Sequence, residues 1–283
     1  MIPALLSGLG ALASVSTQPP PDAALTLHLR YQKKTGDAEF RAANEIAHWD
    51  ARKTAIIICD MWDKHWCEGA TRRVAELAPV MNEVVAAARK RGVFIIHAPS
   101  ETMDFYKDAP QRRRAIEGPP APAPKELHEW QGLDPAREPP LPIDDSDGGC
   151  DSGEKPWYRA WSREHPAIGI APEDAISDKG GEVWNLLQQR GIDNVILMGV
   201  HTNMCVLGRP FSIRKLVGLG KTVVLMRDMT DTMYNPKMRP FVDHFRGTDL
   251  VVEHIEKYWC PSITSGDITG RPPFRFKDDR RAE

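Results

Sequence analysis

The sequence lacks the features that mark three large classes of protein. It has only five cysteines among 283 residues, too few for a disulfide-dense scaffold. Its 37 Lys and Arg residues are balanced by 39 Asp and Glu residues, which argues against a dedicated nucleic-acid binder. No run of 18 apolar residues occurs, so we expect no membrane insertion. No C-x-x-C pair occurs either, which leaves a thiol redox role as a minor alternative.

The first 22 residues differ in composition from the rest of the chain. Residues 2–15 are apolar and rich in small side chains, as in the apolar part of a secretory signal peptide. The usual basic region is missing, because no Lys or Arg precedes Arg30. We expect residues 1–22 to be a leader and linker, and the protein to be exported to the periplasm or outside the cell. If the leader is not a signal peptide, the protein is instead cytoplasmic.

Short apolar runs alternate with helical patterns through most of the chain. Continuous β-branched and apolar runs predict buried strands, and apolar residues spaced three and four apart predict helices. Strands are expected at residues 25–31, 54–59, 93–97, 194–199, 222–226 and 249–253, and helices at 72–92, 182–190 and 210–219. The alternation predicts an α/β fold, a three-layer, doubly wound, mostly parallel sheet, in one domain spanning residues 23–283.

One segment interrupts this alternation. Residues 110–166 contain eleven prolines and three tryptophans, Trp130, Trp157 and Trp161. Low helix and strand propensity combined with aromatic anchors favours an ordered insertion over a flexible linker. We expect an insertion or lid at about residues 107–166.

Polar and reactive side chains follow the predicted strands. In open parallel sheets ligands bind outside the carboxyl ends of the strands, so these side chains are expected to meet at one edge. The candidates for substrate binding are Trp62, His65, Trp66, His97, His201 and Thr202. The aromatic members of this set favour a flat or apolar small molecule as the substrate.

Cys205 is the strongest candidate for a catalytic residue. It lies a few residues past a predicted strand, where a helix should begin, and a helix N-terminus lowers a thiol pKa. Asp60, after the neighbouring strand, is the candidate base. The alternative is a small buried side chain at a helix start, because cysteine is often fully buried.

Three segments carry a resemblance to a known family. The stretches AIIICDMWDKHWC, NVILMGVHTNMCV and TVVLMRDMTDT resemble those of the isochorismatase-like cysteine hydrolases, which include nicotinamidases, other amidases and isochorismatase. The resemblance implies a Rossmann-type α/β fold with Cys205 as nucleophile and Asp60 as base. It also implies a cis peptide bond between Val200 and His201, an oxyanion hole made by the backbone N–H groups of Met204 and Cys205, and a homo-oligomer.

The family's third catalytic residue is a lysine that follows a short strand. Strict register places Asp178 at that position and Lys179 one residue later. Lys179 is therefore the candidate, and Lys155 in the insertion is the alternative. A lysine near the thiol would stabilise the thiolate by its charge.

A divalent metal is a further expectation, although the chemistry requires no cofactor. Nicotinamidases in this family bind a metal through an Asp and several His. Asp63 and His65 have D-x-H spacing and His97 follows the neighbouring strand, so these three are the candidate ligands. The alternative is that they form hydrogen bonds at the rim of the substrate pocket.

The sequence thus favours a cysteine hydrolase that cleaves the C–N bond of a small amide through a thioester. Two alternatives remain: an isochorismatase-type vinyl-ether hydrolase that uses Asp60 without the cysteine, and a catalytically degenerate exported binding protein. In an exported protein Cys67 would pair with Cys150 or with Cys260, and spacing does not decide between them.

Overall fold

The computed structural model describes residues 24–36, 39–127, 129–154 and 158–281. Its strands are β1 (Ala24–Lys34), β2 (Phe40–Asp50), β3 (Thr54–Cys59), β4 (Phe94–Ala98), β5 (Ala175–Ile176), β6 (Asn194–Val200), β7 (Thr222–Asp231) and β8 (Ser262–Ile263). Its helices are α1 (Glu68–Lys90), α2 (Pro110–Ile116), α3 (Gly180–Gln189), α4 (Cys205–Gly208), α5 (Ile213–Gly218), α6 (His244–Tyr258) and α7 (Gly266–Thr269). Two short 3-10 turns, η2 (Ala51–Lys53) and η3 (Met103–Tyr106), complete the elements. The predicted leader, residues 1–22, lies outside the described residues.

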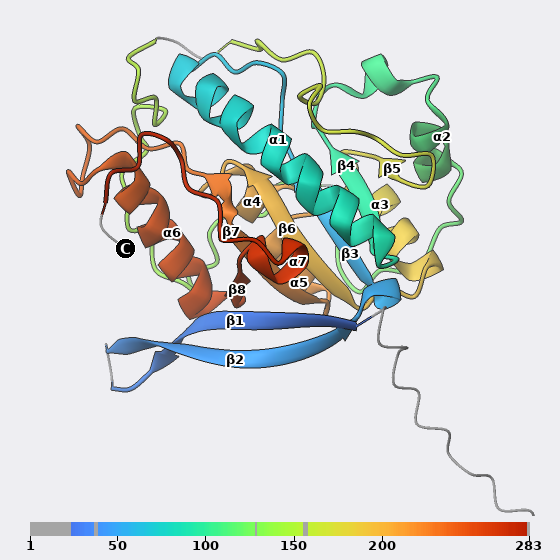
Figure 1. Cartoon of the computed structure of the whole chain (residues 1–283), viewed down its shortest axis with the longest axis horizontal. Coiled ribbons are helices and arrows are strands. Elements are labelled where there is room, and N and C mark those ends of the chain that lie inside the picture. The colour runs from blue at the N-terminus through green and yellow to red at the C-terminus, as the bar shows by residue number, and fades with distance from the viewer. Residues whose placement is uncertain (1–23, 37–38, 128, 155–157, 282–283) are drawn as a thin grey trace, which may run out of the picture.

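The strands form one sheet in the order β2-β1-β8-β7-β6-β3-β4-β5. β3 pairs in parallel with both β4 and β6, and β6 pairs in parallel with β7. β1 pairs antiparallel with both β2 and β8, and β1 and β2 form a hairpin at one edge of the sheet (Figure 1). The predicted α/β class with a mostly parallel sheet is therefore confirmed.

Side chains alternate between two core clusters, one on each face of the sheet. Ile57 of β3 and Leu197 of β6 pack on the face covered by α3, α4 and α5. Their neighbours Ile58 and Met198 pack on the face covered by α1 and α7. Because both faces are covered, these strands are apolar at every position after the first, which is why continuous apolar runs located them.

One predicted strand is wrong. Residues 249–253 lie inside α6, where Asp243 accepts a hydrogen bond from the Phe245 N–H at the helix start. Val251 and Ile255, spaced four apart, are both fully buried by the packing of that helix. A short apolar run does not by itself distinguish a strand from a buried helix.

The described residues of the insertion pack back toward the sheet. Between α2 and β5 its described residues form almost no regular secondary structure. Trp161 is nevertheless 6% exposed, and a disulfide joins Cys150 to Cys67 at the start of α1. The sequence left the partner of Cys67 open, and the structure assigns it to Cys150.

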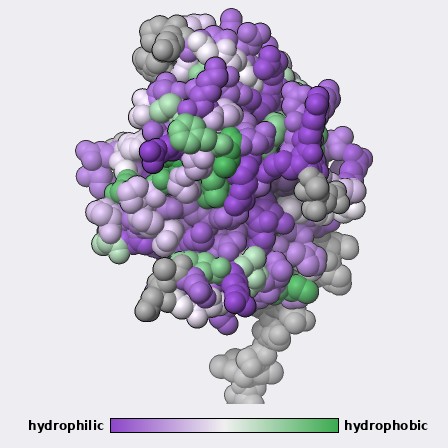
Figure 2. Space-filling view, turned by 90° about the vertical axis from the view of Figure 1, so that its left-hand side faces the viewer, coloured by the Kyte–Doolittle hydropathy of each residue, from purple (hydrophilic) through white to green (hydrophobic). Residues whose placement is uncertain are grey.

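The surface contrasts with this apolar interior. On the side that carries α6, hydrophilic residues predominate and surround a small hydrophobic area (Figure 2). Within the described residues, no helix is both long and apolar enough to cross a membrane.

Candidate active site

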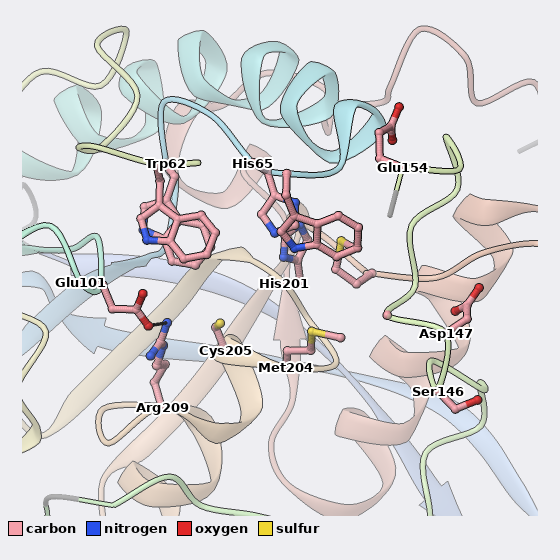
Figure 3. A pocket seen from close by; sticks show the side chains of 14 residues that line it. Trp62, His65, Glu101, Ser146, Asp147, Glu154, His201, Met204, Cys205 and Arg209 are labelled. Carbon is pink, nitrogen blue, oxygen red and sulfur yellow. Dashed lines mark ion pairs between the residues drawn. The ribbon is translucent and has the colours of Figure 1, made fainter. Parts of the chain in front are cut away.

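A cavity of about 560 Å³ opens at the carboxyl ends of the central strands. Its walls come from the segment after β3, the turn between β6 and α4, and the insertion (Figure 3). The lining residues are Trp62, His65, Trp66, Glu101, Ser146, Asp147, Gly148, Glu154, Trp161, His201, Met204, Cys205, Arg209 and Met233. Most of the residues selected from the sequence therefore do meet at this edge.

Cys205 is the first residue of α4 and is 8% exposed. Burial raises the pKa of its thiol, and the negative charge of Asp60 raises it further. The expected lowering of this pKa by a helix start is wrong, because α4 has only four residues and desolvation outweighs its dipole. The resting form is therefore a thiol close to the Asp60 carboxylate, whose charge acts on it.

Asp60 follows β3 directly and is completely buried. Its φ of 46° lies in the left-handed region, which is uncommon for a residue other than glycine and marks a backbone constrained by its surroundings. One carboxylate oxygen accepts the Ser100 N–H at 2.7 Å, and the other accepts the Arg209 Nε–H at 2.9 Å. These bonds fix the carboxylate beside the thiol.

The cation at this site is Arg209, which the sequence analysis did not select. Figure 3 shows its guanidinium next to Glu101 on the Cys205 side of the cavity. The prediction of Lys179 needs correction, because this residue directly precedes α3 and its side chain is 62% exposed. Its ammonium pairs with the Asp178 carboxylate at 3.2 Å, and neither residue lines the cavity. Arg209 lies four residues after Cys205, one helical turn on, and that spacing is the signal that identifies it. The alternative candidate, Lys155, lies outside the described residues.

The turn before α4 has an unusual backbone. The peptide bond between Val200 and His201 is cis. The Met204 N–H already donates to the His201 carbonyl at 3.0 Å, so the structure does not leave it free for an oxyanion. No described residue accepts a hydrogen bond from the Cys205 N–H. Thr202 does not line the cavity, because its hydroxyl bonds Thr230 at 2.7 Å inside the turn.

His97 is not a cavity residue either. It is completely buried, and its two ring nitrogens bond Glu164 at 2.7 Å and Asp174 at 3.0 Å. Burial alone would lower its pKa, but the two carboxylates outweigh burial and raise the pKa to about 9. The prediction that His97 binds substrate is therefore not supported, since the ring has no nitrogen left to offer.

The three candidate metal ligands do not form a metal site. Asp63 accepts hydrogen bonds from the Ser162 and Arg163 backbone and from the Ser162 hydroxyl. Among the described residues, the one group with three ligating atoms close together is Cys67, Cys150 and Asp151, and its two cysteines form the disulfide. Asp63, His65 and His97 therefore do not fit a divalent cation.

Two neutral histidines border the cavity. Burial lowers the pKa of His65 to about 4 and that of His201 well below its ordinary value. The Nδ1 of His65 accepts the Cys67 N–H at 3.1 Å, which leaves its Nε2 as a donor. The Nε2 of His201 is buried and has no partner among the described residues. Both rings can therefore offer a hydrogen bond to a ligand without carrying charge.

An aromatic wall closes one side of the cavity. Trp62 and Trp161 stack with ring centroids 4.2 Å apart and planes 9° apart, and His65 lies nearly parallel to Trp161. Trp161 was noted in the sequence only as an anchor of the insertion. Its pairing with Trp62 shows that the insertion supplies half of the wall.

No protein-family model matches the chain, and no curated protein matches it. Similar solved structures include a cysteine hydrolase from Pseudomonas syringae pv. phaseolicola 1448A, 17% identical, covering 78% of this chain and 93% of that one, with a TM-score of 0.49. A putative isochorismatase from Burkholderia xenovorans LB400 is 17% identical, with 79% and 91% covered and a TM-score of 0.46. An isochorismatase from Pseudomonas putida KT2440 is 12% identical, with 77% and 91% covered and the same TM-score. The structures similar to this chain thus include isochorismatase-family and cysteine hydrolases, at low sequence identity.

Proposed function

We propose that the protein is a cysteine hydrolase that cleaves the C–N bond of a small amide. The observation that carries this proposal is the Cys205 thiol, which lines the cavity close to the buried Asp60 carboxylate. A nucleophile within reach of a fixed base is the arrangement that covalent catalysis requires. The raised thiol pKa fits this role, because the proton then leaves only as the sulfur attacks.

The first half-reaction forms a thioester. The Cys205 sulfur bonds the amide carbon while the thiol proton moves to Asp60, and the carbonyl π electrons move onto oxygen. The Cys205 N–H, which has no acceptor among the described residues, is the donor available to that oxyanion. When the C–N bond breaks, Asp60 returns the proton to nitrogen and the amine leaves.

The second half-reaction restores the enzyme. Asp60 accepts a proton from water as the water oxygen attacks the thioester carbon. The C–S bond then breaks, the acid product leaves, and the sulfur regains its proton from Asp60. The sum is amide plus water giving acid plus amine, with no other reactant.

Arg209 positions Asp60 in this scheme. Its Nε–H bond at 2.9 Å orients the carboxylate, and its charge offsets the negative charge that passes between Asp60, the sulfur and the oxyanion. This is the role that the sequence analysis assigned to a lysine.

Thioester trapping tests the proposal. Wild-type protein incubated with an amide library and quenched in acid should gain an acyl mass on the peptide that contains Cys205. Cys205→Ala should give no adduct and lose at least about 10³-fold in turnover. Turnover that survives in Cys205→Ala but not in Asp60→Asn would overturn the proposal and favour vinyl-ether hydrolysis by Asp60.

We also propose that the protein is exported. The Cys67–Cys150 disulfide supports this, because disulfides persist in oxidising compartments and are rare in the cytosol. Fractionation of cells that express the full chain, with alkylation of free thiols before lysis, tests the compartment and the bond together. A fully reduced pair in cytosolic material would contradict it.

A further inference from the structure

The cavity has a second end, formed by the insertion. We call residues 144–154 the acidic arm; of these, Ser146, Asp147, Gly148 and Glu154 line the cavity. Figure 3 shows Asp147 and Glu154 on the side opposite Arg209, with Cys205 and Met204 between the two sides. A ligand that reaches from Cys205 to the arm therefore meets a different chemistry at each end.

The cavity is lined by more carboxylates than cations, so its net charge is negative. Asp147, Glu154 and Glu101 line it, and Arg209 is its one cationic lining residue among those described. Arg209 already pairs with Asp60 at 2.9 Å and approaches Glu101 at 3.9 Å. The lining histidines, His65 and His201, are neutral because burial lowers the pKa of each. No cation on the lining is left to neutralise the carboxylates of the arm.

The arm is held in place by side chains from other elements. Asn203, in the turn before Cys205, donates to the Asp145 carboxylate at 2.7 Å, and Asn235 donates to that of Asp147 at 2.8 Å. The Cys67–Cys150 disulfide fixes the same segment to the start of α1. A site whose groups are held before the ligand arrives loses less entropy on binding.

An aromatic ring borders the arm, and a buried nitrogen without a partner among the described residues belongs to the same cavity. A methyl group on Gly148 would lie 3.4 Å from the Trp66 ring, so the ring borders the arm directly. An indole face next to carboxylates attracts organic cations through both cation–π and Coulomb terms. Independently, His201 lines the same cavity and its Nε2 is buried without a partner among the described residues, and an orphaned buried nitrogen points to a missing polar ligand.

We propose that the substrate is a two-ended molecule, with an amide at Cys205 and an ammonium or N-alkylated cationic group at the acidic arm beside Trp66. The assignment of the amide end rests on the proposed function, whereas the cationic end rests on the arm. An anionic substrate is disfavoured, because the cation it would need is already paired with Asp60. One end of the cavity thus selects substrates by their charge, and the amide reacts with Cys205 at the other end.

The test measures binding rather than turnover. Three probes of similar length are titrated calorimetrically into Cys205→Ala protein: 4-(trimethylammonio)butanamide, its neutral isostere 5,5-dimethylhexanamide, and the anionic 4-carbamoylbutanoate. The cationic amide should bind about 10-fold more tightly than the neutral one, and the anionic amide most weakly. In an Asp147→Asn, Glu154→Gln double variant the preference for the cation should fall to about 2-fold or less.

Asp144→Asn supplies the matched control. Asp144 carries the same charge in the same arm, but its carboxylate accepts the Ser146 N–H and does not line the cavity. It should keep the preference for the cationic probe. Equal binding of all three probes, or a preference that survives in the double variant, would overturn the proposal. Selective cation binding without thioester formation in the wild type would retain this inference and reject the hydrolase.

Discussion

Two buried polar clusters flank the central strands and differ in how their hydrogen bonds are used. In one, His97 of β4 lies between Glu164 and Asp174, and both of its ring nitrogens are bonded. In the other, the Asp60 and Cys205 pair faces a cavity of about 560 Å³. We call the first the closed cluster and the second the open cluster. Each is almost completely buried, so burial alone does not separate structure from function.

What separates them is where their unpaired polar atoms lie. The Oε1 of Glu164 in the closed cluster is buried without a partner among the described residues, but Glu164 does not line the cavity. The His97 ring has no donor or acceptor left, whereas the His201 Nε2 and the Cys205 N–H have no partner among the described residues. An unpaired buried polar group costs about 1–3 kcal/mol, and in the open cluster these groups belong to residues that line the cavity, where a ligand can complete them. The closed cluster should therefore contribute mainly to stability and the open cluster mainly to activity.

The largest expected effect is in the open cluster, at its cation. Arg209→Gln should lower kcat/KM by about 10³-fold, because Asp60 loses its orienting bond and the developing anion loses its nearest positive charge. Lys179→Gln should change kcat/KM by less than about 2-fold, since that side chain is exposed and its ion pair with Asp178 lies outside the cavity. Steady-state kinetics with the amide found by trapping measures both. A large loss in Lys179→Gln together with a small one in Arg209→Gln would reverse the assignment.

The closed cluster should show the next largest effect, in stability. His97→Gln removes the cation between two buried carboxylates and should lower the free energy of unfolding by about 3 kcal/mol. His201→Gln, the matched change in the open cluster, should cost less than about 1 kcal/mol because no protein hydrogen bond to Nε2 is lost. Urea unfolding followed by circular dichroism compares the two. Equal losses in the free energy of unfolding would show that the two clusters do not differ in their contribution to stability.

The pH dependence of the free energy of unfolding provides a second test of this comparison. The pKa of His97 rises from 6.5 to about 9 on folding. Since the folded value is the higher one, the stabilisation is complete below about pH 6.5 and is lost as the pH rises through about 9. The stability gap between the wild type and His97→Gln should therefore be largest near pH 6 and shrink by pH 9.5. A gap that stays constant over this range would show that His97 is neutral in the folded protein.

The fold was largely predictable because its core is parallel. Strands buried on both faces are continuous apolar runs, and residues 54–59 coincide with β3. Of the β1–β2 hairpin, the sequence predicted β1 but not β2. Residues 25–31 fall within β1, but β2 reads FRAANEIAHWD, whose burial pattern is mostly exposed or intermediate. A strand fixed by pairing with its neighbour rather than by burial leaves little pattern in the sequence.

In the candidate site, the sequence predicted only the residues that directly follow or lie close to predicted strands. Asp60 and Cys205 each follow a recognisable strand, so their convergence follows from the topology. Trp161 and Asp147 come from the proline-rich insertion, whose path depends on tertiary contacts and the disulfide. His97 lies near the carboxyl end of β4, and Asp60 directly follows β3. Only the contacts of His97 with Glu164 and Asp174 show that its nitrogens are taken.

The disulfide fixes the insertion to the start of α1, and its loss should have a smaller effect. The bond spans 83 positions, so Cys150→Ser should lower the free energy of unfolding by about 2 kcal/mol. Because the bond fixes the acidic arm, it should also weaken binding of the trimethylammonium probe more than that of its neutral isostere. Urea unfolding and calorimetry measure the two effects. Cys260→Ser is the matched control, since Cys260 is a free buried thiol. If the binding of both probes weakened equally, the disulfide would act on the whole cavity rather than on the arm.

The smallest expected effect, a change of a few fold, concerns the charge balance around the Cys205 sulfur. Burial and Asp60 raise the pKa of this thiol, and Arg209 partly offsets them. Alkylation of Cys205 by iodoacetamide, followed by peptide mass spectrometry, should therefore keep accelerating up to pH 10, because only the thiolate reacts. Asp60→Asn should speed labelling at pH 8 and Arg209→Gln should slow it, each by a few fold, because the two substitutions change the local charge in opposite directions. Fast labelling of the wild type below pH 8 would instead reveal a resting thiolate, and the base would then have to act on water rather than on the thiol.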